Sequence, residues 1–449
     1  MNKLERVYLK DIADTQTGPF GTQLHEKDYV NVGTPIVTVE HLGEIGFNKQ
    51  NLPLVSEADK LRLSKYILKE GDIVFSRVGS VDRCTYVSNK EDGWMFSGRC
   101  LRVRFNEKAN AKYVSYYFRQ KFFKEMMLNI SVGATMPSLN TSLMANIPLY
   151  LPKKEIQQKI ASVLSSLDSK IELNNRINAE LEAMAKTLYD YWFVQFEFPV
   201  VTSSGVEKPY KTSGGKMVWN EELKREIPTG FGTGSLLSLG EIIGGSTPPR
   251  EVQEYFSQNG TAWITPKDLS MNGNNKFISK GELDVSDKGI KAASLNVMPK
   301  GTIMLSTRAP IGYLAISRKD VTTNQGFKSF VPNKGFSTEY VYYSIKNMIP
   351  TIENNAVGST FKEISATTLK SIPVILPEKE TIENYTSKVR PIFERQNLLE
   401  QENQKLSELR DWLLPMLMNG QVKVGEVDDK VELGMAAEPR GTYNKSNVK

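Results

Sequence analysis

The sequence predicts an α+β protein with two homologous strand-rich domains, each followed by a long helix. Three observations predict this fold class. The chain repeats itself at a lag of about 225–230 residues. Each copy begins with short apolar runs that Gly, Asn and Pro interrupt, which is typical of strands joined by turns. Each copy ends in a stretch whose apolar residues recur in steps of three and four, as in a coiled-coil helix.

The repeat consists of short matched segments that keep their order along the chain. The matched pairs are 33–42 with 260–269, 71–76 with 301–306, 132–135 with 357–360, and 147–155 with 372–380. The last pair shares the pattern Ile-Pro-x-x-Leu-Pro without a gap. Because order, spacing and residue type all match, we infer that the chain contains a duplication.

The repeat and the shifts in composition divide the chain into six segments. They are a first domain (1–152), a first helical segment (153–196), a polar linker (197–228), a second domain (229–377), a second helical segment (378–423) and a tail (424–449). The tail is polar and charged, so we expect it to be disordered.

The elements within each domain follow from the apolar runs. In the first domain the runs 34–39, 72–77 and 101–105 are predicted strands. A helix is predicted next at 111–127, and its counterpart in the second domain is 338–348. Each domain then closes with its extended Ile-Pro-x-x-Leu-Pro segment, because proline blocks a central strand and disfavours helix at the residue before it.

A coiled-coil seam is predicted along both long helices. The seam residues that we expect are Ile160, Leu164, Leu167, Ile171, Ile177, Asn178, Leu181, Met184, Leu188 and Trp192 in the first helix, and Tyr385, Val389, Ile392, Leu399, Asn403, Leu406, Leu409, Leu413 and Leu417 in the second. Asn178 and Asn403 occupy the same position in the two copies, where a polar residue weakens a seam but fixes its register. Pro391 and Pro415 are expected to kink the second helix or to mark its ends.

Composition excludes several classes of protein. The formal charge of +6 and the pI of about 8.9 are compatible with binding a polyanion but do not demonstrate it. Two cysteines, Cys84 and Cys100, cannot form a disulfide framework, and we expect buried thiols in a reducing cytoplasm. The spacing of these residues with His25 and His41 is not that of a zinc site, and no metal is expected. His41 is interpreted as a surface or strand-edge residue. No signal peptide or membrane span is predicted.

Enzyme motifs are absent from the sequence, so we expect a non-catalytic chain. There is no Asn-Pro-Pro or Asp-Pro-Pro before an aromatic residue, as an amino-methyltransferase requires, and no Pro-Asp dipeptide of the commonest nuclease signature. The segment 214–216 lacks the first glycine and the final Ser or Thr of a P-loop. The glycine-rich segment 230–234 neither follows a clear strand nor opens a helix, and is interpreted as a loop.

With its two non-catalytic copies, each a strand-rich domain followed by a heptad helix, the chain resembles the specificity (S) subunits of type I restriction–modification systems. The residues that carry this resemblance are Gly-Asp-Ile-Val-Phe-Ser-Arg at 71–77, Thr-Asn-Gln-Gly at 323–326, the two Ile-Pro-x-x-Leu-Pro boundaries, Gly-Gly-Lys-Met-Val-Trp at 214–219, and 239–248. One departure is Glu380-Thr381-Ile382, where the family has Glu-x-x-x-Ile, which puts the start of the second helix in doubt.

The resemblance implies a division of labour. Each domain would be a target recognition domain that reads one half of a bipartite, asymmetric sequence in double-stranded DNA. The helices would pair antiparallel as a spacer and dock two modification methyltransferase subunits. Motor–nuclease restriction subunits would complete the complex. S-adenosylmethionine, ATP and Mg would bind those partners, and no cofactor is expected on this chain.

The candidate DNA contacts are basic and hydroxyl residues in loops at equivalent places of the two copies. Arginine is favoured among them because it can form two hydrogen bonds to guanine. They are Arg77, Arg83, Arg99, Arg102 and Thr135 in the first copy, and Arg250, Lys267, Arg308, Lys328 and Thr360 in the second.

Two other classes of function stay open at this point. The chain could be a coiled-coil adaptor whose two domains bind protein ligands, with no DNA role, or an enzyme with an unrecognised site. Sequence-specific DNA binding in the presence of a methyltransferase partner would separate the specificity subunit from both.

Overall fold

The computed structural model describes residues 4–424 except 22, 134, 202–204, 274, 309 and 359–361. The predicted tail, 424–449, lies outside the described residues apart from its first residue. The chain forms two compact units, each taking in part of both long helices. Unit 1 comprises Met1–Lys170 and Leu406–Lys449, and unit 2 comprises Ile171–Lys405.

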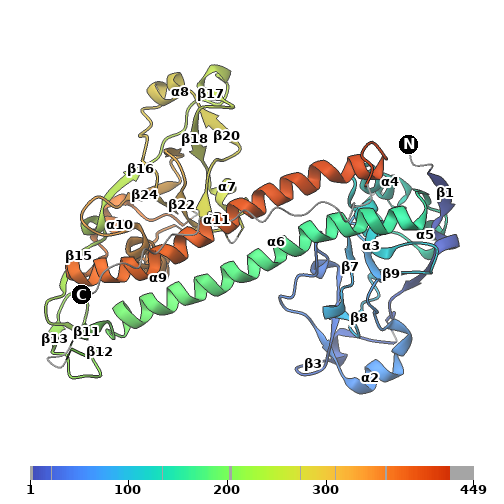
Figure 1. Cartoon of the computed structure of the whole chain (residues 1–449), viewed down its shortest axis with the longest axis horizontal. Coiled ribbons are helices and arrows are strands. Elements are labelled where there is room, and N and C mark those ends of the chain that lie inside the picture. The colour runs from blue at the N-terminus through green and yellow to red at the C-terminus, as the bar shows by residue number, and fades with distance from the viewer. Residues whose placement is uncertain are drawn as a thin grey trace, which may run out of the picture. The chain divides into compact units, whose positions relative to one another are not determined.

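Unit 1 contains a strand pair and two four-stranded sheets (Figure 1). β1 (Glu5–Tyr8) pairs antiparallel with β10 (Pro148–Leu151). The first sheet has the order β2 (Ala13–Thr17), β9 (Cys100–Phe105), β6 (Ile73–Ser76), β7 (Cys84–Tyr86), and the second has the order β3 (Tyr29–Val30), β5 (Leu54–Val55), β4 (Thr34–Val37), β8 (Met95–Phe96). The helices of its globular part are α1 (Leu9–Ile12), α2 (Glu57–Arg62), α3 (Ala111–Arg119), α4 (Lys121–Ile130) and α5 (Thr141–Ala145).

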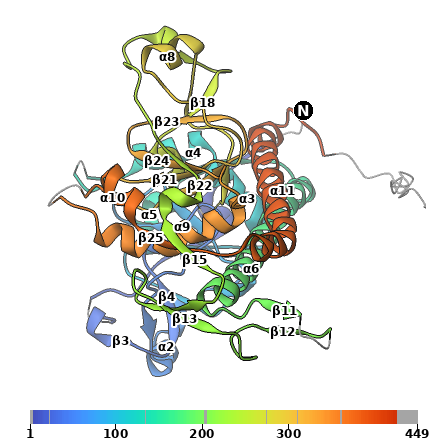
Figure 2. The same ribbon diagram turned by 90° about the vertical axis from the view of Figure 1, so that its left-hand side faces the viewer.

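Unit 2 repeats this plan. β15 (Gly232–Ser235) pairs with β25 (Pro373–Leu376). One sheet has the order β16 (Glu241–Gly244), β24 (Phe327–Val331), β21 (Ile303–Ser306), β22 (Leu314–Ser317), β19 (Phe277–Ile278), and the other has the order β17 (Phe256–Ser257), β20 (Leu283–Val285), β18 (Thr261–Ile264), β23 (Val321–Thr323). Its short helices are α7 (Pro266–Met271), α8 (Asp287–Ala292) and α10 (Ala366–Ser371), and its longer one is α9 (Thr338–Asn354). In each unit the second sheet lies away from the long helices (Figures 1 and 2).

The duplication predicted from the sequence is confirmed by this topology, because the strand orders of the two units match one to one apart from the added β19. The predicted helix 111–127 differs from the structure. It is two helices, α3 and α4, since Gln120 between them is extended (φ −67°, ψ 143°). The counterpart α9 instead runs past the predicted end at 348, through Pro350.

The linker predicted at 197–228 contains two hairpins. β11 (Pro199–Val201) pairs with β12 (Glu207–Pro209), and β13 (Met217–Asn220) pairs with β14 (Arg225–Pro228). Phe198 stacks on Tyr210 at 4.6 Å and on Phe231 at 5.1 Å between ring centroids. The aromatic side chains thus attach the linker to the core of unit 2.

The long helices are α6 (Lys154–Tyr189), which continues into a π-helical turn at Asp190–Val194, and α11 (Lys379–Met418). Neither Pro391 nor Pro415 ends α11. Within unit 2 the helices are antiparallel, because Asn174 bonds Asn403 at 2.9 Å, whereas Gln396, earlier in α11, donates to the backbone oxygen of Asn178, later in α6, at 3.3 Å.

The predicted seam is only partly correct. The buried members are Ile160, Leu164, Ile171, Trp192, Tyr385, Val389, Leu399 and Leu417, and Ile177 is half-buried. The half-buried members are Leu167, Asn178, Leu181, Leu188, Ile392, Asn403, Leu406 and Leu413.

Met184 (58% exposed) and Leu409 (43%) face solvent, so their assignment to the seam was wrong. The fully buried polar residue of α6 is Asn174 rather than Asn178, and its Nδ2 donates to both Asn403 and Glu402. No described helix is both long enough and apolar enough to cross a membrane.

Candidate functional site

Four loops meet at one end of the first sheet of unit 1, where β2 and β6 end and β9 and β7 begin. Backbone hydrogen bonds join them. Arg77 N–H donates to Arg99 O at 2.8 Å, and Leu139 N–H donates to Arg77 O at 2.9 Å. Gly79 N–H donates to Pro137 O at 2.9 Å. We call this group loop cluster 1; it comprises residues 18–21, 77–82, 97–99 and 131–139, with 134 outside the described residues.

Unit 2 builds the same group with two equivalent bonds. Thr307 N–H donates to Gly326 O at 2.8 Å, as Arg77 does to Arg99, and Ile364 N–H donates to Thr307 O at 3.1 Å, as Leu139 does to Arg77. This group, loop cluster 2, comprises residues 245–250, 307–308, 324–326 and 357–364, with 359–361 outside the described residues. The duplication therefore preserves a backbone frame while the side chains on it differ.

A glycine allows the close packing of two loops in both backbone frames. A Cβ on Gly18 would lie 2.1 Å from Ser97 O, and a Cβ on Gly245 would lie 2.1 Å from Asn324 O. Real side chains do not approach a carbonyl oxygen this closely, so only glycine lets the first loop pack on the loop before β9 or β24.

A Gly18→Ala substitution is expected to lower the free energy of unfolding of unit 1 by about 1–3 kcal/mol, since the added methyl must push two backbone segments apart. Hydrogen exchange of the amides of β2 and β9 measures this. Gly21→Ala is the matched control, because a Cβ on Gly21 meets nothing within 4 Å. Equal protection in the two variants would contradict the close approach.

Three of the residues predicted in unit 1 lie in loop cluster 1, namely Arg77, Arg99 and Thr135. Arg83 is exposed at the start of β7 and lines a cavity beside the cluster. Arg102 is not in a loop. It lies within β9, is 5% exposed, and its guanidinium donates to Asp14 at 2.9 Å. This bond stabilises the edge pairing of β2 with β9, so Arg102 takes no part in the surface proposed below.

The predicted residues of unit 2 are more dispersed. Arg250 and Arg308 lie in loop cluster 2, and Arg308 pairs with Glu363 at 2.9 Å. Lys267 is exposed on α7 and pairs with Glu282 at 2.7 Å. Lys328 is not in a loop but is half-buried in β24, next to the cluster. Thr360 lies outside the described residues.

His41 is fully buried, so its interpretation as a surface residue was wrong. Its Nδ1 accepts the N–H of Thr38 at 3.0 Å. In unit 2, Asp268 accepts the N–H of Thr265 at 2.8 Å in the same way. Both side chains are therefore acceptors that hold the turn after β4 or β18, which explains why one replaces the other in the repeat.

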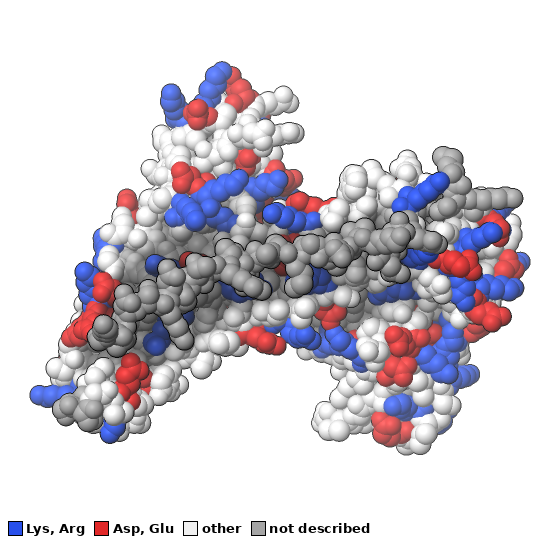
Figure 3. All heavy atoms as spheres, in the orientation of Figure 1, with Lys and Arg blue, Asp and Glu red and all other residues white. Residues whose placement is uncertain are grey.

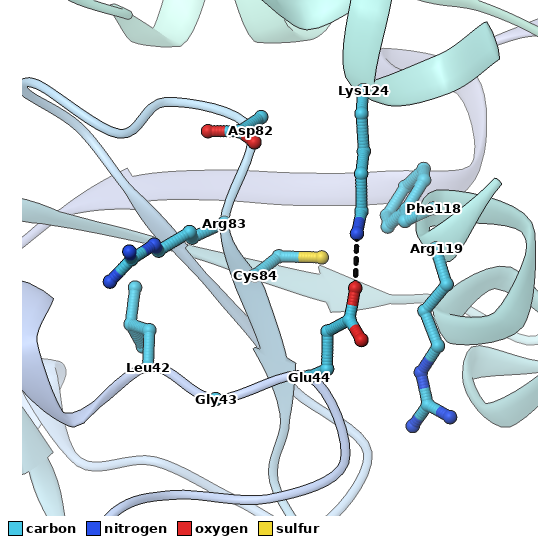
Figure 4. Close-up of a pocket in the computed structure, with 9 residues that line it drawn as sticks. All are labelled: Leu42, Gly43, Glu44, Asp82, Arg83, Cys84, Phe118, Arg119 and Lys124. Atoms are coloured by element: carbon cyan, nitrogen blue, oxygen red, sulfur yellow. Dashed lines mark hydrogen bonds and ion pairs between the residues drawn. The ribbon is translucent and has the colours of Figure 1, made fainter. Parts of the chain in front are cut away.

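A cavity of about 370 Å³ lies in unit 1 between the loop after β4, strand β7 and helices α3 and α4 (Figure 4). Glu44 and Lys124 form an ion pair across it, and the hydrogen bond from Lys124 lowers the pKa of Glu44. The Cys84 thiol points into this space, and burial raises its pKa to about 12. Such a thiol is not a nucleophile at neutral pH. Sequence reasoning missed Glu44 and Lys124 because only the fold brings them together.

Surface charge alone does not mark a site. Figure 3 shows Lys and Arg interspersed with Asp and Glu on the displayed face of each unit. Among the described residues no group of His, Cys, Asp or Glu has the arrangement of a metal site. The duplicated loop clusters are thus the feature with which chemistry can be associated.

The similarity to known proteins covers both copies of the repeat. A family model described as type I restriction modification DNA specificity domain matches residues 1–183 and 228–408. The chain is 29% identical over 413 residues to the HindI specificity subunit of a type I restriction enzyme from Haemophilus influenzae, covering 80% of this chain and 88% of that one.

Two further similarities differ in extent. The type I restriction enzyme MjaIX specificity subunit of Methanocaldococcus jannaschii is 40% identical over 171 residues, which span 37% of this chain and only 39% of that relative. The crystal structure of a type I restriction–modification S subunit from M. genitalium superposes with a TM-score of 0.60 at 14% identity, over 93% of this chain and 96% of that one. This last likeness concerns the fold.

Proposed function

The chain belongs to the family of type I restriction–modification DNA specificity domains, and from this premise we propose that its two units read the two halves of a bipartite, asymmetric sequence in double-stranded DNA. Loop cluster 1 would face one half-site and loop cluster 2 the other. The observation that carries this proposal is the shared backbone frame with different side chains. The two loop clusters would hold their DNA-contacting side chains in similar positions but present different side chains to each half-site.

The reading groups that we propose are the predicted basic and hydroxyl residues that lie in the described parts of the two clusters. Arg77, Arg99 and Thr135 serve in unit 1, and Arg250 and Arg308 serve in unit 2. Arginine can bond a guanine edge or a phosphate, and the two roles are separable by the salt dependence of binding. Linking two modest readers in one chain raises their effective concentration and therefore the affinity for the whole target.

The partners that we propose are two modification methyltransferase subunits, which bind S-adenosylmethionine, and motor–nuclease subunits, which use ATP and Mg. The helices carry apolar residues that no part of the described chain covers, such as Met184 and Leu398 (59% exposed) in unit 2 and Trp412 (55%) in unit 1. Exposed apolar side chains on a helix are typical of a docking surface. The chain itself would be non-catalytic and act in the cytoplasm.

Exchanging residues 1–150 for the equivalent domain of a relative is expected to change one half-site and leave the other intact. The change should be complete, because specific contacts in one unit do not depend on the other. Genome-wide mapping of methylated adenines, in cells that carry the chain with its modification subunit, measures both half-sites at once.

The matched control exchanges residues 229–377 and should change the opposite half-site. If either exchange alters both half-sites, the units are not independent readers. If the chain with its methyltransferase partner binds no specific DNA, the adaptor function replaces the one proposed.

A further inference from the structure

Loop cluster 1 exposes large apolar side chains beside its arginines. Phe20 is 48% exposed and Met136 is 65% exposed. Burial of these side chains in the core of unit 1 would be favourable, yet they stay at the surface formed by the four loops. Their position in the cluster therefore calls for a partner with an apolar feature.

Contacts of the Phe20 ring and of the backbone just before it hold this side chain in place. The Arg77 guanidinium lies 4.7 Å from the centre of its ring, and Arg77 is itself fixed because its Nη1 donates to Gly98 O at 3.3 Å. The close approach of Gly18 to Ser97 fixes the backbone just before Phe20. The ring is thus preorganised, which lowers the entropic cost of any contact that it makes.

Met136 lies in a tight loop that is closed at its base. Val132 N–H and Ser138 N–H exchange hydrogen bonds with each other's carbonyl oxygens at 3.0 and 2.9 Å, and Gly133 makes the turn with a positive φ of 107°. The bond of Gly79 to Pro137 ties the loop to the rest of the cluster. Met136 is therefore presented from an anchored loop, although its own unbranched side chain can adapt.

Loop cluster 2 differs at the position of Phe20. Thr247, in the loop that corresponds to that of Phe20, donates a hydrogen bond to Gln325. Arg308 is engaged by Glu363. Val357 is exposed like its counterpart Val132. In unit 2, Thr247 stands at the position of Phe20, whereas the counterpart of Met136 in the repeat is Phe361, which lies outside the described residues.

Duplex DNA offers one apolar group on its base edges, the 5-methyl group of thymine in the major groove. Insertion of Phe20 between base pairs would need both faces of its ring, and Arg77 covers one of them. On the basis of the function proposed above, we propose that unit 1 recognises thymine methyl groups of its half-site through Phe20 and Met136.

The test replaces thymine by uracil, which removes the methyl group and keeps the base pair. The complex of the chain with its modification subunit is titrated with duplexes that carry uracil in one half-site at a time. Uracil in the half-site of unit 1 should weaken binding about four-fold for each methyl contacted. Uracil in the half-site of unit 2 is the reference, and Phe20→Ala and Met136→Ala should leave its effect on binding unchanged.

Phe20→Ala and Met136→Ala should lower the affinity for the thymine duplex and abolish or reduce the difference between thymine and uracil. Phe20→Leu should keep part of that difference, which shows that the loss in Phe20→Ala is not one of folding. Phe122→Ala is the matched control, since Phe122 is equally exposed (46%) in unit 1 but lies in α4, outside the cluster.

Three outcomes would overturn the inference. They are a half-site of unit 1 that contains no thymine on either strand, specific binding that is indifferent to uracil, and a thymine preference that Phe20→Ala and Met136→Ala leave intact. Each of these leaves specific DNA binding in place, so each is distinct from a failure of the proposed function, in which no duplex would bind specifically.

Discussion

The Asp168→Ala variant is expected to lose about 3–5 kcal/mol of the free energy of unfolding of unit 1, the usual cost of removing one partner from a buried ion pair. The Asp168 carboxylate is 9% exposed and accepts hydrogen bonds from Tyr116 Oη at 2.7 Å and Arg119 Nη1 at 3.2 Å, both on α3. Its other oxygen accepts Arg410 Nη1 of α11 at 2.9 Å. Burial alone would raise the pKa of Asp168, but Arg119, Tyr116 and Arg410 together lower it.

Removal of this carboxylate takes away the Asp168 ion pair of Arg119, whose side chain is only 11% exposed, and leaves Arg410, 13% exposed, with its pair to Asp411. Hydrogen exchange of α3 amides measures the loss, and the amides of unit 2 serve as an internal reference. Glu125→Ala is the matched control, because it breaks an exposed pair with Lys121 and should change stability by less than about 1 kcal/mol. A similar small change for Asp168→Ala would show that water replaces the carboxylate.

Unit 2 is expected to be destabilised by acid through Glu182, and the Glu182→Gln variant should lose that dependence. Glu182 on α6 accepts Lys276 Nζ and Lys346 Nζ, each at 2.6 Å. Burial would raise its pKa, but Lys276 and Lys346 lower it to about 2. Because the folded state binds its proton more weakly than the unfolded state does, the contribution is fully present above the ordinary value of 4.5 and is lost as the pH falls toward 2.

The lowered pKa of Glu182 corresponds to a contribution of about 3 kcal/mol to the free energy of unfolding of unit 2. Denaturant unfolding at a series of pH values between about 6 and 3, followed by tryptophan fluorescence, measures it. At neutral pH, Glu182→Gln should be less stable than the wild type, since Lys276 is 3% exposed and would keep only neutral partners. Glu180→Gln, two residues away at an exposed position of α6, is the control. Parallel pH profiles for the wild type and Glu182→Gln would assign the acid sensitivity to other groups.

The duplication, the fold class and the long helices could be predicted from the sequence, because they are expressed in local patterns and in the order of matched segments. The residues of the coiled-coil seam were harder to predict from the sequence. Its predicted register included Met184, which is exposed, and omitted Asn174, which is buried. Heptad steps identify one apolar stripe along a helix. The globular parts of the chain pack on the same helices, so different faces of α6 are covered at different positions along its axis.

The candidate site was predicted in part. Arg77 and Arg308 could be found because each follows a matched strand. Arg102 was misplaced because the sequence does not reveal that its guanidinium reaches Asp14 on the neighbouring strand β2. Phe20 and Met136 were not identified, because each is unremarkable in its own segment and only the backbone bonds between loops place them on one surface.

Unit 1 is assembled from the beginning of the chain and from a helical segment after Lys405. Leu417 and Met418 of that segment are each 3% exposed and belong to the same core as Leu9 and Ile73. During synthesis the ribosome releases 1–170 long before 406–418 exist, whereas all of unit 2 is complete by residue 405. The half that is made first therefore finishes folding last, and nascent unit 1 exposes the apolar surface for Leu417 and Met418 until α11 is complete. Chains that stop within α11 would leave that surface open, and chaperones or proteases would act on them at this half of the molecule.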